Sequence, residues 1–173
     1  ERTYVSGEAH YLWGKPYRLQ VVYDGTRASV VKKASKLVMT VPASYTLEQR
    51  ERVMTEWYRA ELRRVLKSAT RRCEQVTGVE EFRIKNMKTR WGTCNIPERR
   101  IWLNLQLVKK PPECLDYVIT HELVHLVEAN HTHRFHELME EYCPTWREAD
   151  KALKEMPLDQ ISEGEMPIAE RNA

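Results

Sequence analysis

The chain has 173 residues, of which 42% are hydrophobic and 31% are charged, and its formal net charge is +3. These values suit one soluble globular domain with a small appendage, and they exclude collagen, a coiled coil and wholesale disorder. No stretch approaches the roughly 18 consecutive apolar residues of a transmembrane helix, so we expect no membrane partner.

The cysteines favour a reducing compartment. All four stand at least 20 residues apart and form no C-x-x-C pair. This spacing indicates free thiols and a cytoplasmic location. The sequence begins at Glu1 rather than at Met, so we expect further residues to precede it in the native chain.

The first 41 residues predict a β-meander. Residues 17–23 alternate between polar and apolar side chains and lead to Asp24-Gly25, which is typical of a hairpin. Further strands are expected at residues 28–31 and 36–41. We therefore assign residues 1–45 to an N-terminal β-rich subdomain.

A long helix is predicted to follow. Thr46 and Gln49 form a capping box, apolar residues recur at helical spacing from Met54 to Val76, and Gly78 marks the end. The opposite face of this helix is basic and carries Arg59, Arg63, Lys67, Arg71 and Arg72.

The remaining elements are expected to form a domain over residues 46–156. Residues 80–108 resemble strands, with a turn or bulge at 91–95 and a strictly alternating strand at 101–107. Helices are predicted at 113–129, 134–142 and 146–155, with Asn130 as a left-handed residue ending the first of them. Residues 157–173 read as a polar, acidic and loosely ordered tail.

The most informative feature is a concentration of histidines. Five of the six histidines lie between residues 121 and 136. Within that segment, His121-Glu122-Leu123-Val124-His125 is an H-E-x-x-H motif in a predicted helix, so both imidazoles face the same side and can bind one zinc ion. Glu122 is then placed to act as the general base toward a metal-activated water.

A catalytic zinc site needs a third protein ligand. We favour His131, because the helix should end just before it and the chain can turn back to the metal. His133 and His136 are the alternatives, followed by a more distant glutamate at 137, 140 or 141.

Several segments together resemble a known family. They are R-W-G-T-C at 90–94, I-x-L-N-x-x-L at 101–107, D-Y-V-x-x-H-E-L-x-H at 116–125 and N-H-x-x-x-F at 130–135. The chain resembles the YgjP-like metallopeptidase domain, which is related to the WLM and SprT-type zincins. Thr93 stands where Ser is usual, and His136 where Trp or Tyr is usual.

The resemblance implies an α+β, zincin-like fold: a small twisted, mostly antiparallel sheet, a long backing helix and the H-E-x-x-H helix. It implies one zinc per chain, bound by His121, His125 and His131, with Glu122 as the catalytic base. It also implies a sheet edge beside the active-site helix. Our candidate edge is the strand 101–107, which would pair with a peptide substrate.

Other residues are weaker candidates for the cleft. Arg90, Tyr117 or Tyr142 can stabilise an oxyanion, and no pattern selects among them. Trp102 suits either stacking or core packing. The remaining candidates for cleft or substrate contact are Asn104, His133 and His136.

Three functions are compatible with these patterns. A zinc-dependent peptidase acting on peptide or protein is our first interpretation. The second comes from the resemblance, because some YgjP-like proteins have been described as UTP pyrophosphatases: it is a nucleoside triphosphate (UTP) pyrophosphatase that uses the same metal site. Residues 61–110, with 13 basic and 5 acidic residues, would suit a triphosphate. The third is a nucleic-acid-associated binding module with structural zinc, which Glu122 argues against.

Overall fold

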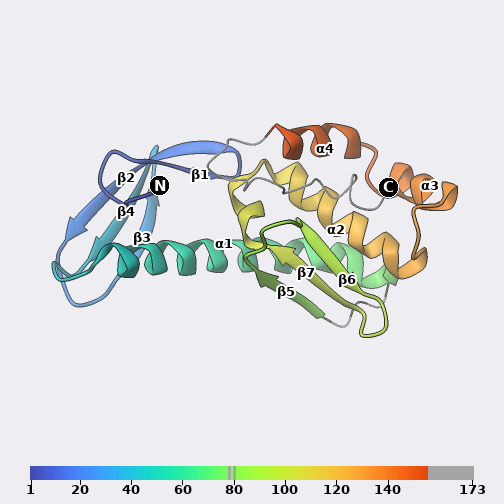
Figure 1. The fold of residues 1–173 in the computed structure, drawn as a ribbon, viewed down its shortest axis with the longest axis horizontal. Coiled ribbons are helices and arrows are strands. Elements are labelled where there is room, and N and C mark those ends of the chain that lie inside the picture. Colours follow the sequence, from blue (N-terminus) through green and yellow to red (C-terminus); the bar gives the residue numbers. More distant parts are fainter. Residues whose placement is uncertain (78, 80, 156–173) are drawn as a thin grey trace.

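The computed structural model describes residues 1–77, 79 and 81–155, and within the long helix it places side chains only as far as residue 68. The described residues form an α+β fold in which two small sheets lie along one long helix (Figure 1). The elements are β1 (Ala9–Leu12), β2 (Lys15–Tyr23), β3 (Ser29–Lys33), β4 (Lys36–Val41), α1 (Leu47–Thr77), β5 (Glu81–Lys85), β6 (Gly92–Asn95), β7 (Arg100–Asn104), the 3-10 helix η1 (Leu105–Lys109), α2 (Pro112–Val127), α3 (His133–Tyr142) and α4 (Trp146–Lys154).

The N-terminal strands form a sheet of order β1-β2-β4-β3, so the predicted meander is wrong. Strand β4 lies between β2 and β3 and runs parallel to β2, and Asp24-Gly25 therefore begins a crossover rather than a hairpin. Burial explains this order. Leu37, Met39 and Val41 of β4 are fully buried, whereas most of β3 is exposed, so β4 takes the central position and β3 the edge.

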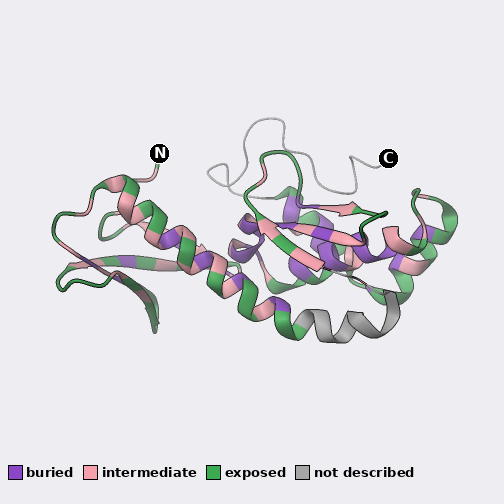
Figure 2. Ribbon diagram, turned by 90° about the horizontal axis from the view of Figure 1, so that it is seen from below, coloured by how far each residue is buried: buried purple, intermediate pink, exposed green. Residues whose placement is uncertain are grey.

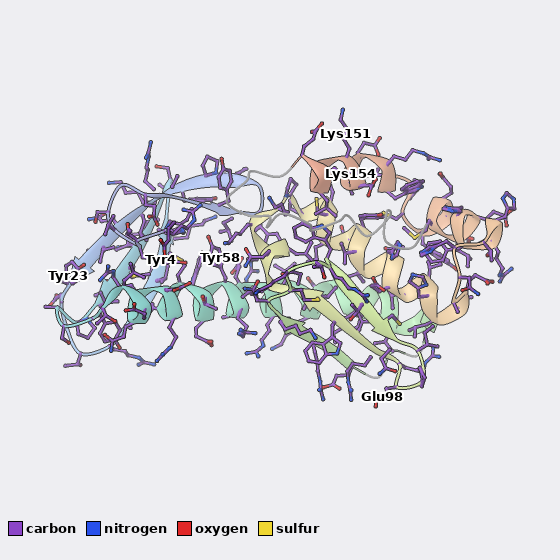
Figure 3. The ribbon with its side chains drawn as sticks, viewed as in Figure 1. Tyr4, Tyr23, Tyr58, Glu98, Lys151 and Lys154 are labelled. Atoms are coloured by element: carbon purple, nitrogen blue, oxygen red, sulfur yellow. The ribbon has the colours of Figure 1, made fainter. Side chains whose placement is uncertain are left out.

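Helix α1 begins as predicted, at a reciprocal capping box. The Thr46 backbone N–H donates to Gln49 Oε1 at 2.8 Å, and the Gln49 backbone N–H donates to Thr46 Oγ1 at 3.3 Å. The helix runs along the N-terminal sheet and then passes behind the second sheet in the view of Figure 1. Tyr58 projects from it toward β1, where its hydroxyl donates to the Tyr11 carbonyl at 2.7 Å (Figure 3).

The second sheet has the order β5-β7-β6, with β5 parallel and β6 antiparallel to β7. It is mixed rather than mostly antiparallel. Strand β7 is central, so our candidate edge strand at 101–107 is internal. Residues 92–95, expected as a turn or bulge, form the edge strand β6 instead.

The central strand also ends earlier than predicted, at Asn104. The Asn104 side chain accepts a hydrogen bond from the Gln106 backbone N–H at 3.0 Å and caps the 3-10 helix η1. In that helix Leu105, Leu107 and Val108 are all buried. The alternation of leucines suits a strand equally well, and the cap decides between the two conformations.

The turn between β1 and β2 joins the N-terminal sheet to the rest of the molecule. Trp13 and Gly14 both have positive φ, as a two-residue hairpin turn of this kind requires. Their backbone N–H groups donate to the carbonyls of Val108 and Lys109 at 2.8 and 3.0 Å. A Cβ on Gly14 would stand 3.0 Å from the ring of Pro111, so only glycine allows this close approach.

The three C-terminal helices match the prediction closely, with one exception. Helix α2 ends at Val127 and Glu128 continues in an extended conformation, while Asn130 is not left-handed. Buried residues gather where α2 meets the second sheet (Figure 2). None of the described helices combines the length and apolarity needed to cross a membrane. The predicted domain boundaries stay predictions, and the tail 157–173 lies outside the described residues.

Candidate metal centre

Helix α2 places two histidines on one side. Pro112 starts the helix at a position where proline is tolerated, because its missing N–H has no helical partner there. His121 and His125 lie one turn apart, and their ring centroids are separated by 4.9 Å. His121 is only 3% exposed, so its imidazole is held in the interior rather than in solvent.

His131 returns to this pair because of how the following helix begins. The chain leaves α2 in an extended conformation, and Thr132 caps α3 by accepting a hydrogen bond from the Phe135 backbone N–H at 3.3 Å. The short connection turns His131 back toward α2. One ligand atom from each of His121, His125 and His131 lies within 4.8 Å of the others.

Phe135 supports all three rings. It is 2% exposed, and its ring centroid lies 5.2 Å from that of His121, 4.8 Å from that of His125 and 4.5 Å from that of His131. An aromatic ring in this position fixes the imidazoles by packing and keeps water away from one side of the cluster. The sequence contained this residue in the N-H-x-x-x-F segment, but its spacing alone did not reveal its role.

The protonation state of His125 suits metal binding. Its Nδ1–H donates to the Ala129 carbonyl at 3.0 Å, which leaves the Nε2 lone pair for a metal. Burial lowers the pKa of His125 and so favours the neutral imidazole, the form that ligates metals. His121 Nδ1 is buried without a hydrogen bond and lies 3.5 Å from Glu122 Oε1. The donor set therefore fits a metal ion such as zinc.

Glu122 is buried beside this cluster, with 3% of its surface exposed. Its side chain packs against strand β6 at Gly92, where an added Cβ would stand 3.2 Å from Glu122 Cγ and 2.9 Å from Val118 Cγ1. Gly92 is thus a site residue that our sequence reasoning did not single out. The glycine in the R-W-G-T-C segment was the available signal, and nothing local to it indicates contact with α2.

Comparison with models of known protein families matches residues 1–156 to the family described as YgjP-like, metallopeptidase domain. The chain belongs to the YgjP-like family. The resemblance inferred from the four sequence segments is confirmed, and a metal-dependent hydrolase is the function that membership indicates. Neither the curated proteins nor the solved structures gave a match.

The rival ligands of this YgjP-like protein lie away from the cluster. His133 is the first residue of α3, is 90% exposed and contacts Glu137 with its Nε2 at 3.0 Å from Oε1. His136 is exposed on the same helix. Among the glutamates, Glu140 pairs with Trp146 and Arg147, and Glu137 and Glu141 are exposed.

The structure separates the other candidate cleft residues. Asn104 is 2% exposed, and its Nδ2 donates to the carbonyls of Met87 and Arg90 at 3.0 and 2.7 Å, so it organises the loop at 86–91. Arg90 is exposed just before β6. Trp102 pairs in register with Thr93, whereas Gly92 pairs with Leu103, so Trp102 lies on the sheet face opposite to Glu122.

The cysteines do not add to the cluster. Cys94, Cys114 and Cys143 are free thiols among the described residues, as the sequence predicted, and Cys73 lies outside the described side chains. Burial and then the charge of Glu122 raise the pKa of Cys94 to about 11, so its thiol stays protonated at neutral pH.

Proposed function

We propose that the chain is a zinc-dependent hydrolase that cleaves peptide bonds, with Glu122 as general base and with His121, His125 and His131 as the zinc ligands. The observation that carries the proposal is the convergence of three imidazoles within 4.8 Å next to a buried glutamate. A purely structural metal site has no need of a carboxylate in that position.

The histidines, Glu122 and Phe135 have separate roles in the proposed hydrolysis. His121, His125 and His131 would hold the zinc ion, which would act as a Lewis acid toward the substrate carbonyl and lower the pKa of water. Glu122 removes the proton from the attacking water and later delivers it to the leaving amine. Burial keeps the imidazole of His125 neutral, and its hydrogen bond to Ala129 fixes the tautomer that leaves Nε2 for the metal. Phe135 packs against the three rings and excludes water from behind the ligands.

Strand β6 offers the substrate an edge. It is the outer strand of its sheet, and Gly92 on its inner side touches Glu122. An extended peptide pairing with β6 would carry its scissile carbonyl along α2, toward the three histidines. This moves the predicted substrate edge from residues 101–107 to residues 92–95.

The ligand assignment is tested by metal analysis of matched variants. We expect about one zinc per chain in the native protein and in His133→Ala and His136→Ala, and loss of zinc in His131→Ala. Zinc retained in His131→Ala and lost in either of the other two variants would move the third ligand to α3.

The role of Glu122 is tested by activity at constant metal content. Glu122→Gln should bind zinc normally and hydrolyse an unfolded protein substrate about 100- to 10,000-fold more slowly. The Glu122→Gln variant alone does not distinguish a peptidase from a pyrophosphatase, because both activities would depend on the same residues. A parallel assay on UTP separates the two. Turnover of UTP alone, lost in Glu122→Gln, would replace the peptidase by the alternative.

A further inference from the structure

The second sheet has one face buried and one face open. Phe82 and Ile84 of β5 and Ile101 and Leu103 of β7 pack into the core. Because side chains alternate along strands, their neighbours point the other way. We call this opposite side the outer face; its residues are Glu81, Arg83, Lys85, Thr93, Asn95, Arg100 and Trp102.

Trp102 occupies the middle of the outer face, on the central strand. Its ring is partly exposed, with Lys85 Nζ 4.5 Å and the Arg83 guanidinium 5.5 Å from the ring centroid. Trp102 is therefore not simply a core residue, which was the other role that the sequence allowed for it. Both cations lie over the ring, and both belong to long, exposed side chains. A base that replaced them on the ring would stack on Trp102 and leave the two positive charges beside its own phosphates.

The charge around the outer face is strongly basic. Residues 81–104 contain six basic and two acidic residues. Both acids are engaged: Glu81 pairs with Arg83 and Arg100 at 2.6 and 2.9 Å, and Glu98 pairs with Arg100 at the tip of the β6–β7 connection (Figure 3). Lys85, which is exposed, has the Trp102 ring as its contact rather than a carboxylate among the described residues, so a phosphate would not have to displace a carboxylate from it.

Helix α1 extends this basic surface beyond the sheet. Arg59, which pairs with Glu56, donates from Nη1 to the Ile84 carbonyl at 3.4 Å, so its turn of the helix lies against β5. Arg63 and Lys67 follow at intervals of four residues and are exposed. The positive charge therefore continues from the outer face along α1.

We propose that the outer face binds single-stranded nucleic acid, with a base stacked on Trp102 and phosphates held by Lys85, Arg83 and the basic turns of α1. Stacking platforms surrounded by positive charge bind single strands with little sequence preference, because every base has a flat face. A duplex keeps its bases stacked on one another, so it would meet only the charges. The outer face is opposite to Glu122, and binding there leaves the metal cluster accessible.

The test measures the affinity of the full chain for a fluorescein-labelled oligothymidylate of about 20 nucleotides. Trp102→Ala should weaken binding about tenfold or more, whereas Trp102→Phe should retain most of the affinity. Lys85→Gln should weaken binding and reduce the slope of log affinity against log salt by about 0.7. Lys36→Gln removes an exposed charge from the N-terminal sheet and should change nothing.

Three results would overturn the proposal. They are no binding at low salt, unchanged affinity in both Trp102→Ala and Lys85→Gln, or binding of duplex DNA and heparin as tight as that of the single strand. Thermal melts verify folding, and Lys85→Gln alters only an exposed side chain, so the test survives if Trp102→Ala is unstable. Hydrolysis of an unfolded protein is assayed in the same variants, and its persistence would separate this proposal from the proposed function.

Discussion

Gly92→Ala should damage the proposed active site through one added methyl group. Gly92 does not have a positive φ, so alanine fits the backbone and the cost comes from crowding alone. The new Cβ would stand 2.9 Å from Val118 Cγ1, closer than side-chain carbons normally approach, and 3.2 Å from both Glu122 Cγ and the Trp102 carbonyl oxygen. Val118 is fully buried, so its side chain can move only against the packed core.

Overpacking of this kind costs about 1–3 kcal/mol. For a chain of this size that lowers the melting temperature by roughly 3–10 °C. Glu122 is also pushed from its position, and a displacement near 1 Å lowers a catalytic rate by about 100-fold. Zinc content should be unchanged, because none of the three atoms nearest to the added Cβ belongs to His121, His125 or His131.

Thermal unfolding, zinc analysis and proteolytic rate are measured together on Gly92→Ala. Gly25→Ala is the control, since nothing lies within 4 Å of a Cβ there and its positive φ adds only backbone strain. Gly25→Ala should lose stability but keep its rate per folded molecule. A Gly92→Ala protein with native melting temperature and native rate would refute the packing of Glu122 against β6.

Three further predictions concern stability. Asn104→Ala should lower the free energy of unfolding by about 2–4 kcal/mol in urea titrations, because it strips hydrogen bonds from the loop at 86–91 and the cap of η1. Burial lowers the pKa of His10 from 6.5 to about 4, so between these pH values the unfolded chain binds a proton that the folded chain does not. The free energy of unfolding should therefore fall as the pH drops from about 6.5 to about 4. His10→Gln should flatten the slope of melting temperature against pH in that range. Removing zinc with a chelator should lower the melting temperature of the native chain but not that of His131→Ala, and equal shifts in both would contradict the ligand assignment.

Local patterns predicted the clustering of the three histidines better than they predicted the sheets. The positions of His121 and His125 follow from helical spacing, and the return of His131 follows from the helix end before it. Both depend on contacts within about a dozen residues. The capping box at Thr46 and Gln49 was equally readable, because each residue bonds the other's backbone.

The strand order depends on contacts between distant residues, which no local pattern contains. Asp24-Gly25 is typical of a hairpin, yet β4 enters between β2 and β3 because it buries Leu37 and Met39 most completely. The edge position of β6 was missed for a similar reason. Its four residues carry a glycine and few apolar side chains, and the pairing with β7 together with the contact of Gly92 with α2 gives the segment its place.

The docked turn at Trp13 and Gly14 bears on how the chain tolerates change. Hairpin tips are ordinarily the positions where insertions and fusions do least harm. This tip is excluded, since extra residues there would break the hydrogen bonds to Val108 and Lys109 immediately before α2. A tag or reporter belongs instead at residues 25–27, which are exposed. Removal of the N-terminal sheet would not yield a minimal enzyme, because it would expose the Val108 and Lys109 carbonyls beside Pro111.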